Sequence, residues 1–228
     1  MTIKVIAFDV NETLLDLSSL DDEFAARLGS AALRPQWFAQ MLQLSFVGGL
    51  TGQYVDFRTA QLAAFEMLAE RQGVALDPGA AEAVVDRMSS LAPHPEVGAA
   101  LKRLARTPLR LVALTNSTEV VARAQVENAG LADYFEDVLS ADSVRALKPA
   151  AAAYQHVAST CGVGIDEIRL VAAHPWDVSG ALAAGCRAAF MGRSGVVPSP
   201  LGPRPDIVGA DLDEIVDQII ARDVDAVR

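Results

Sequence analysis

The sequence is poor in cysteine and contains no hydrophobic run long enough to cross a membrane. Its 228 residues include two cysteines, Cys161 and Cys186, whose spacing matches neither a metal-ligand motif nor a disulfide framework. We interpret both as packing residues. No uninterrupted apolar stretch approaches the ~20 residues that span a bilayer. The amino-terminal residues lead directly into a strand-like segment, without a signal-peptide pattern, so we expect a cytoplasmic protein.

Basic residues are also scarce. Lys and Arg number 19 against 29 Asp and Glu, which gives a formal net charge of -10. Nucleic acids and anionic membranes bind clustered Lys and Arg, so this charge argues against both as partners. Hydrophobic residues, by contrast, make up 51% of the chain. The length suits one core domain with an insertion, or one large α/β domain, with a substantial core.

One further absence concerns the residue two positions after Asp9. Asp9 ends the apolar run 3–8, and Thr13 follows four residues later, so a carboxylate lies where a buried strand meets a loop. This is a typical position for a nucleophile. A phosphate-handling site of this type needs a second acid to hold a metal, but the sequence has Asn11 there. The missing carboxylate points away from phosphoryl transfer.

Short apolar segments alternate with Ala-rich helical segments along most of the chain. This alternation favours an α/β fold, a doubly wound, Rossmann-like parallel sheet covered by helices on both faces. The active sites of such sheets lie at the carboxyl ends of the strands. The predicted strands are 3–8, 109–114, 168–172 and 187–191, with a weaker one near 206–208, and the predicted helices are 119–129, 150–161 and 178–185.

The segment 17–90 breaks this alternation, because it has helical patterns without a convincing strand. Its apolar and aromatic residues recur at three- or four-residue spacing and are mostly helix-packing core. The glycine pair 48–49, with Gly52, predicts a turn between two of these helices. We therefore predict an α/β core domain from residues 1–16 and 91–228, and an inserted helical cap domain from residues 17–90.

Polar residues lie at the ends of several predicted strands. Each has a plainer explanation, since Ser117 suits a helix N-cap, Lys148 a solvated loop, and Asp177 the first turn of a helix. Strand ends of a doubly wound sheet meet at one crevice, however, and this convergence argues for a shared site. The segments concerned are Asp9 to Thr13, Thr115-Asn116-Ser117, Lys148-Pro149 and His174-Pro175-Trp176-Asp177.

These motifs, taken in order, resemble those of the haloacid dehalogenase (HAD) superfamily. The resemblance covers essentially the whole chain, including the inserted helical cap, and is strongest to the type II (S)-2-haloacid dehalogenases. The motifs that carry it are Asp9-x-x-x-Thr13, Thr115-Asn116, Lys148-Pro149 and Asp177, supported by Tyr154 six residues after Lys148, by Trp176 beside Asp177, and by Ser140-Ala141-Asp142.

The resemblance implies a hydrolase that removes halide from small 2-haloalkanoic acids without a metal or other cofactor. Asp9 attacks the carbon that bears the halogen, and water hydrolyses the resulting ester. Lys148 keeps Asp9 ionised and oriented, and Asp177 holds Lys148 and orients the water. A homodimer is an open alternative to a monomer. The implied catalytic residues are Asp9, Thr13, Lys148, His174 and Asp177, and the implied substrate-binding residues are Val10, Asn11, Trp37, Phe38, Thr115, Asn116, Tyr154 and Trp176.

The chain departs from the type II pattern at two places. Those enzymes carry a cap arginine beside a tryptophan, and alignment through Trp37 puts Phe38 at that position, with Arg34 and Arg58 the nearest arginines. The Ser and Asn usual around the water site appear as Ala172 and His174. We expect His174 to substitute by polarising water.

Three interpretations stay open. The first is a metal-independent 2-haloacid dehalogenase. The second is a HAD hydrolase of another substrate, either phosphatase-type or a dehalogenase relative with little activity on standard 2-haloacids because of Phe38. Phosphatases of the superfamily place acids where this chain has Asn11 and Ala173, which leaves a poor magnesium site. The third, a binding protein without catalysis, is least favoured because Asp9 and Lys148 are both present.

Overall fold

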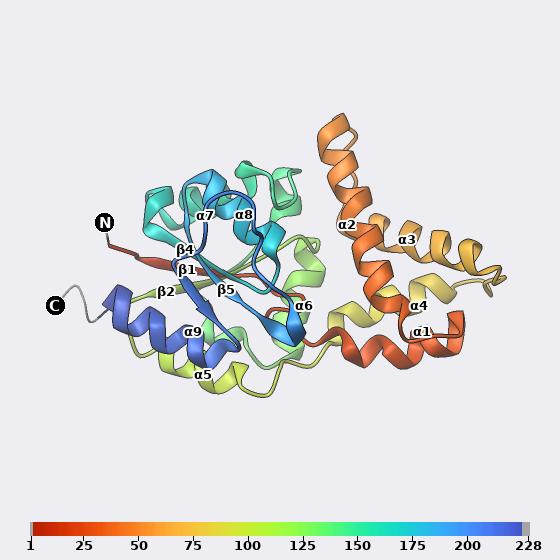
Figure 1. Cartoon of the computed structure of the whole chain (residues 1–228), viewed down its shortest axis with the longest axis horizontal. Coiled ribbons are helices and arrows are strands. Elements are labelled where there is room, and N and C mark those ends of the chain that lie inside the picture. Colours follow the sequence, from red (N-terminus) through yellow and green to blue (C-terminus); the bar gives the residue numbers. More distant parts are fainter. Residues whose placement is uncertain (1, 225–228) are drawn as a thin grey trace.

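Six parallel strands form one sheet at the centre of the fold. In the computed structural model, which describes residues 2–224, the strand order is β3-β2-β1-β4-β5-β6 (Figure 1). β1 is paired with β2 on one side and with β4 on the other, so the carboxyl ends of these three strands lie side by side. The strands are β1 Val5–Phe8, β2 Arg110–Thr115, β3 Asp137–Ser140, β4 Ile168–Ala172, β5 Arg187–Met191 and β6 Ile207–Gly209.

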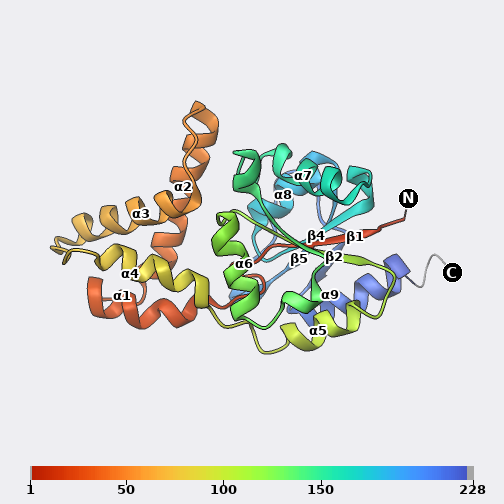
Figure 2. The same ribbon diagram turned by 180° about the vertical axis from the view of Figure 1, so that it is seen from behind.

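Helices cover both faces of this sheet. One face carries α5 (Val97–Leu104), α6 (Glu119–Asn128) and α9 (Leu212–Ile219), and the other carries α7 (Ala151–Cys161) and α8 (Pro175–Ala184) (Figures 1 and 2). The predicted doubly wound α/β class is therefore confirmed. Short 3₁₀ segments occur at Leu17–Leu20, Arg87–Ser90, Ala132–Tyr134, Ala141–Val144, Ile165–Glu167 and Arg193–Gly195, and a π-helical turn at Ile220–Val224 follows α9.

The core has two layers because the side chains of a strand alternate between the two faces of the sheet. Successive side chains of a strand point to opposite faces, so β1 sends Ile6 and Phe8 towards α5 and α9, while Val5 and Ala7 pack with α7 and α8. All four side chains are almost fully buried. Burial on both faces explains why the sequence of β1 is a continuous apolar run instead of an alternating one.

Four helices between β1 and β2 stand apart from the sheet. They are α1 (Asp21–Leu28), α2 (Leu33–Thr51), α3 (Phe57–Gln72) and α4 (Ala80–Asp86) (Figures 1 and 2). Their core includes an aromatic cluster in which the ring of Phe24 lies 5.3 Å from those of both Trp37 and Phe65. No helix among the described residues is long and apolar enough to cross a membrane.

Two chain segments run side by side between these helices and the sheet. The Asp16 amide donates to the Ala92 carbonyl at 2.8 Å, and the His94 amide donates to the Leu14 carbonyl at 2.9 Å. Leu15 and Pro93 form an isolated antiparallel bridge between them. This paired neck supports our proposal that residues 17–90 are the cap domain, because the chain enters and leaves the helical part within a few residues of both proposed bounds.

Most predicted elements are confirmed, with differences at particular residues. The weak strand near 206–208 is β6, and helix α8 begins at Pro175, three residues before the predicted start. The sequence analysis did not predict β3, α5 or α9. The predicted turn between two cap helices is present, but it begins at Gly52 and not at 48–49, since α2 continues to Thr51 and Gly52 ends it in the left-handed conformation. A side chain at position 48 would meet the Gln53 carbonyl at 2.7 Å, which is the physical reason for glycine there.

Candidate active site

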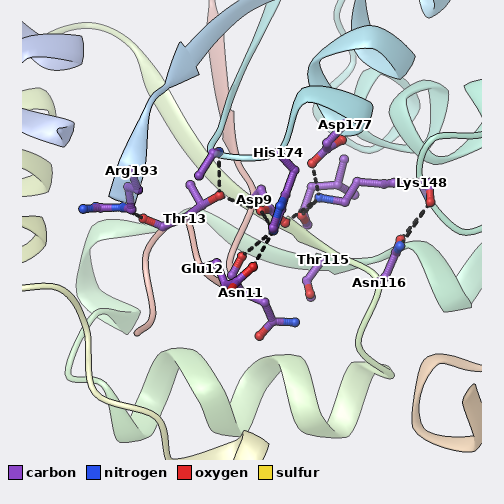
Figure 3. Close-up of polar contacts among 12 residues, drawn as sticks. Asp9, Asn11, Glu12, Thr13, Thr115, Asn116, Lys148, His174, Asp177 and Arg193 are labelled. Carbon is purple, nitrogen blue, oxygen red and sulfur yellow. Dashed lines mark hydrogen bonds and ion pairs between the residues drawn. The ribbon is translucent and has the colours of Figure 1, made fainter. Parts of the chain in front are cut away.

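Residues from three adjacent strand ends surround one buried ammonium group. The Nζ atom of Lys148 lies 2.7 Å from Oδ1 of Asp9 and 2.6 Å from Oδ2 of Asp177 (Figure 3). It also donates to the Leu114 carbonyl at 2.9 Å, near the end of β2. An ammonium group has three N–H donors, so these partners use all of them. Lys148 is 1% exposed, which is rare for a lysine unless it is paired in this way.

The charges of this cluster shift the pKa values of its members in different directions. Burial raises the pKa of the Asp9 carboxyl, but the charges of Lys148 and His174, together with hydrogen bonds, outweigh burial and bring that pKa below its usual value. Burial lowers the pKa of Lys148, but Asp177 and Asp9 more than compensate and raise it. For Asp177, burial and the nearby Asp9 charge outweigh Lys148, so its pKa is raised. Asp9 is therefore the more readily ionised carboxyl.

Two further side chains fix the position of Asp9 and Lys148. The Thr13 hydroxyl donates to Oδ2 of Asp9 at 2.6 Å and accepts from the Ala173 amide at 2.9 Å, which ties the loop after β1 to the end of β4. The Asn116 side chain accepts from the Lys148 amide at 2.7 Å and donates to the Lys148 carbonyl at 3.1 Å. Both oxygens of Asp9 thus have a donor, and the backbone of Lys148 is held on both sides.

Tyr154 lies behind this cluster, in helix α7. Its hydroxyl donates to Oδ1 of Asp177 at 2.6 Å, while Oδ2 of Asp177 accepts a hydrogen bond from Nζ of Lys148. Burial and the Asp177 charge raise the pKa of Tyr154 well above its usual value, so the phenol stays protonated and remains a donor. Asp177 has no exposed surface, and its side-chain oxygens are both engaged. It is placed to hold Lys148.

His174 lies near Asp9, between two aromatic rings. Its ring centroid is 5.2 Å from that of Phe38 and 5.2 Å from that of Trp176, with interplanar angles of 19° and 21°. The Nε2 atom lies 3.1 Å from the Asn11 carbonyl and 3.7 Å from Oδ2 of Asp9. The stack joins cap helix α2 to the start of α8, and it fixes an imidazole edge beside Asp9.

A small cavity of about 10 Å³ lies among these residues, enough for one water molecule. Several predicted site residues line it together with Phe57, and they bring the cap and the sheet to one place. Thr13 and Asp177 lie outside the lining and bind residues within it, and Tyr154 lies behind Asp177. The predicted residues that line the cavity are Asp9, Asn11, Phe38, Thr115, Asn116, Lys148, His174 and Trp176.

Besides Tyr154, two predicted substrate-binding residues lie outside the lining of this cavity. Trp37 is fully buried in the cap, where its indole N–H donates to the Gln61 carbonyl at 2.9 Å and its ring packs on Phe24. Val10 is likewise fully buried in the hydrophobic core. In this geometry Phe38, the neighbour of Trp37 on α2, faces the site instead, because successive residues of a helix point about 100° apart.

The nearest arginines do not line the cavity. Arg34 donates to Asp21 at 2.5 Å and to Glu12 at 3.2 Å, and it borders a neighbouring cavity that also contains His94 and His174. Arg58 pairs with Asp86 near the cap surface. Neither guanidinium occupies the place that Phe38 fills.

Sequence reasoning missed two residues that support the loop after β1. Gln125 of α6 donates to the Asn11 side chain at 2.8 Å, and Arg193 donates to the Thr13 carbonyl at 3.0 Å while pairing with Glu96. They lie more than 100 residues from the loop in the sequence, and no local motif marks them. Among residues 2–224, no group of three or more His, Cys, Asp or Glu side chains is arranged to hold a metal ion.

The fold and this site define a class: a doubly wound α/β enzyme with a helical cap over the carboxyl ends of its strands. A family model described as haloacid dehalogenase-like hydrolase matches residues 3–185, about four fifths of the chain. The chain therefore belongs to the haloacid dehalogenase-like hydrolases.

Named relatives cover nearly the full length. The chain is 32% identical to haloacetate dehalogenase H-2 of Moraxella sp. (strain B), over 94% of this chain and 96% of that protein. It is 31% identical to the (S)-2-haloacid dehalogenase of Pseudomonas sp. (strain YL), over 94% of each. The solved L-2-haloacid dehalogenase of Xanthobacter autotrophicus matches with a TM-score of 0.88 and 27% identity, over 96% of this chain and 99% of that one.

Proposed function

We propose that this protein is a metal-independent 2-haloacid dehalogenase that works through an ester on Asp9. The observation that carries the proposal is the Asp9–Lys148 pair at 2.7 Å, at the wall of a cavity shared by cap and sheet. A carboxylate is a weak nucleophile unless it is ionised and oriented. Lys148 and Thr13 provide both conditions, because each binds one oxygen of Asp9. The similarity to named haloacid dehalogenases agrees with this chemistry.

The first step is a displacement at carbon. One carboxylate oxygen of Asp9 forms a bond to the carbon that bears the halogen, and the carbon–halogen bond breaks with its electron pair on the departing halide. The substrate is a small anionic 2-haloalkanoic acid, whose carboxylate must be held by donors in the cavity wall. We assign Thr115, Asn116 and the loop after Asp9 to this task, because they line the cavity beside the nucleophile.

The second step is hydrolysis of the ester. A water oxygen attacks Cγ of Asp9, the bond from Cγ to the substrate oxygen breaks, and the 2-hydroxy acid leaves. Asp9 keeps the water oxygen, and its lowered pKa favours release of the second water proton to solvent, which restores the carboxylate. We assign the proton transfer to His174, which takes a proton from the water and delivers it to the departing alkoxide. His174 lines the cavity, and its Nε2 atom lies 3.1 Å from the Asn11 carbonyl and 3.7 Å from Oδ2 of Asp9, whereas both side-chain oxygens of Asp177 are already bound. The proposed role of Asp177 is to position Lys148.

The donor set also supports a reaction without a metal. Asn11 is engaged with Gln125 through its side-chain oxygen, position 173 is alanine, and the Lys148 ammonium lies between the two carboxylates. Magnesium needs several hard oxygen ligands, and a phosphate dianion facing Asp9 would need such an ion to reduce repulsion. These residues therefore favour a haloacid over a phosphate ester, which is the second candidate substrate.

The test is halide release from enantiopure 2-chloro and 2-bromo acids, with and without a strong chelator. Asp9→Asn serves as the blank, and a panel of phosphate esters tests the second candidate. We expect release that survives chelation and falls by roughly 10⁴-fold or more in the blank. A mass increase on the Asp9 peptide after rapid quenching should accompany it. Phosphate release that requires added magnesium, without halide release, would refute the proposal.

A further inference from the structure

Glu12, in the loop that follows the nucleophile, has a left-handed backbone with a φ of 59°. Residues other than Gly, Asn and Asp rarely adopt this conformation, because their Cβ atom comes too close to the following carbonyl oxygen. Strain of this kind persists where the surrounding structure requires it, and it is concentrated at functional sites. A glycine would fit this backbone without strain, so the presence of Glu12 points to a use for its carboxylate.

The carboxylate of Glu12 lies between a cap arginine and His174. Its Oε1 atom accepts a hydrogen bond from Arg34 of cap helix α2 at 3.2 Å. Its Oε2 atom lies 3.8 Å from Nε2 of His174 (Figure 3). One oxygen is thus held by the cap, and the other faces the imidazole to which the proposed second step assigns the proton transfer.

The Nε2 atom of His174 faces hydrogen-bond acceptors. Besides Glu12, it lies 3.1 Å from the Asn11 carbonyl and 3.7 Å from Oδ2 of Asp9. A carbonyl and two carboxylates cannot donate, so Nε2 carries the hydrogen, and the neutral ring takes its next proton at Nδ1. Within residues 2–224, Asp9 and Glu12 are the two acids in ion-pair range of this ring.

The proposed first step removes one of these two charges. In the free enzyme Asp9 and Glu12 both place negative charge beside the ring of His174. Once Asp9 has become an ester it is neutral, and Glu12 is then the anion that remains beside the imidazole. At this stage the ring takes a proton from water and keeps it until the product alkoxide leaves. A carboxylate 3.8 Å away stabilises the imidazolium that exists in between.

Glu12 also lines a second cavity, which has a volume of about 160 Å³. His174 lines both this cavity and the smaller one beside Asp9. The wall is polar, and it includes Nε2 of His94, a buried atom without a hydrogen-bond partner in the part of the chain that the structure describes. Polar space of this size holds several water molecules. The second cavity can therefore hold the water that the second step consumes, next to the ring that deprotonates it.

We propose that Glu12 is a positioning residue for hydrolysis of the Asp9 ester and acts through His174. The inference rests on the proposed function and concerns its second step alone. The proton passes from the attacking water to the imidazole and then to the departing alkoxide, so Glu12 neither gains nor loses a proton. Its carboxylate orients the ring through Nε2 and balances the positive charge of the imidazolium.

A single turnover, with enzyme in excess over 2-chloropropionate, separates the two steps. Chloride release follows formation of the ester, and the appearance of 2-hydroxypropionate follows its hydrolysis. In Glu12→Gln, chloride release should keep its wild-type rate, because the charge of Glu12 is not needed while Asp9 is ionised. Formation of 2-hydroxypropionate should slow by roughly tenfold or more. The Asp9 ester, measured as a mass increase on the Asp9 peptide after rapid quenching, should accumulate.

Two further variants separate the carboxylate from other effects. Glu12→Gly removes the carboxylate but fits the left-handed backbone, so it should show the same slow hydrolysis as Glu12→Gln. Asp21→Asn is the matched control, because Asp21 is the other acid bound by Arg34, at 2.5 Å, and is not in ion-pair range of His174. This variant should keep both rates.

Equal slowing of both steps in Glu12→Gln would overturn the proposal, as would unchanged hydrolysis in that variant or wild-type hydrolysis in Glu12→Gly. Slow hydrolysis in Asp21→Asn would also overturn it, since the effect would then come from the contacts of Arg34. If the wild type releases halide but Glu12→Gln shows no selective loss of hydrolysis, the proposed function stands and the role of Glu12 fails. If the wild type releases no halide from any 2-haloacid, both fail.

Discussion

The Phe38 ring of cap helix α2 lies stacked on the imidazole of His174, with their centroids 5.2 Å apart. This contact places an apolar cap side chain against an imidazole whose Nε2 atom lies 3.7 Å from Oδ2 of Asp9. Together with the contacts of Tyr54 with Asp142 and of Arg34 with Glu12, it holds the cap on the sheet. The cavity beneath has room for one water, so it must widen to admit a 2-haloacid.

Replacing Phe38 by Arg should raise the turnover of small 2-haloacids roughly tenfold, because a guanidinium beside the cavity adds donors for the departing halide. Halide release from 2-chloropropionate measures the effect. Leu50→Arg is the matched control, since it adds the same charge on the same helix at a site that is 88% exposed. No gain over this control would show that the cap serves a different, more apolar substrate.

Replacing Lys148 by Met should destabilise the protein by about 3–5 kcal/mol at neutral pH, because it leaves Asp9 and Asp177 buried without their cation. Urea unfolding measures the free energy. Lys4→Met removes an exposed ion pair with Glu167 and should leave the unfolding midpoint nearly unchanged. Equal effects of the two substitutions would contradict the buried cluster described above.

The pKa of Asp9 should rise in Lys148→Met. In the wild type it lies below 3.8, so the stability that Asp9 contributes is present above that pH and is lost as the pH falls through the folded-state pKa. Without Lys148, burial dominates, and the carboxyl should gain its proton above pH 3.8. NMR titration of the carboxyl carbons follows this change. Asp56, whose pKa is lowered by its bonds to Thr59, should titrate as before.

Gly180→Ala should disturb the support of Asp177. A Cβ atom at position 180 would lie 2.5 Å from Cβ of Pro149 and 2.6 Å from the Tyr154 hydroxyl, so α8 or Tyr154 must move. We expect a loss of about 1–3 kcal/mol in stability together with reduced turnover. Gly98→Ala in α5 is the control, because its Cβ has no neighbour within 4 Å and should stabilise the helix by roughly 0.5–1 kcal/mol. Similar outcomes for both would refute the steric argument.

The sequence predicted the parts of this protein that depend on local pattern. The apolar runs predicted β1, β2, β4 and β5, because buried parallel strands are apolar on both faces. Polar residues at their ends predicted a common site, because parallel strands bring their carboxyl ends to one edge. β3 was missed because its four residues, Asp137–Ser140, begin with an acid and form the edge of the sheet.

What the tertiary structure decided is which side chains meet, and which groups lack a partner. From the sequence, both Trp37 and Phe38 were predicted to bind the substrate. The rotation of about 100° between successive helix residues instead puts Trp37 in the cap core and Phe38 on His174. Likewise, the support of Asn11 by Gln125 and the unpaired indole of Trp176 depend on packing between elements far apart in the chain. A sequence fixes the periodicity of each element, whereas the approach of two side chains across a cavity depends on how whole elements pack.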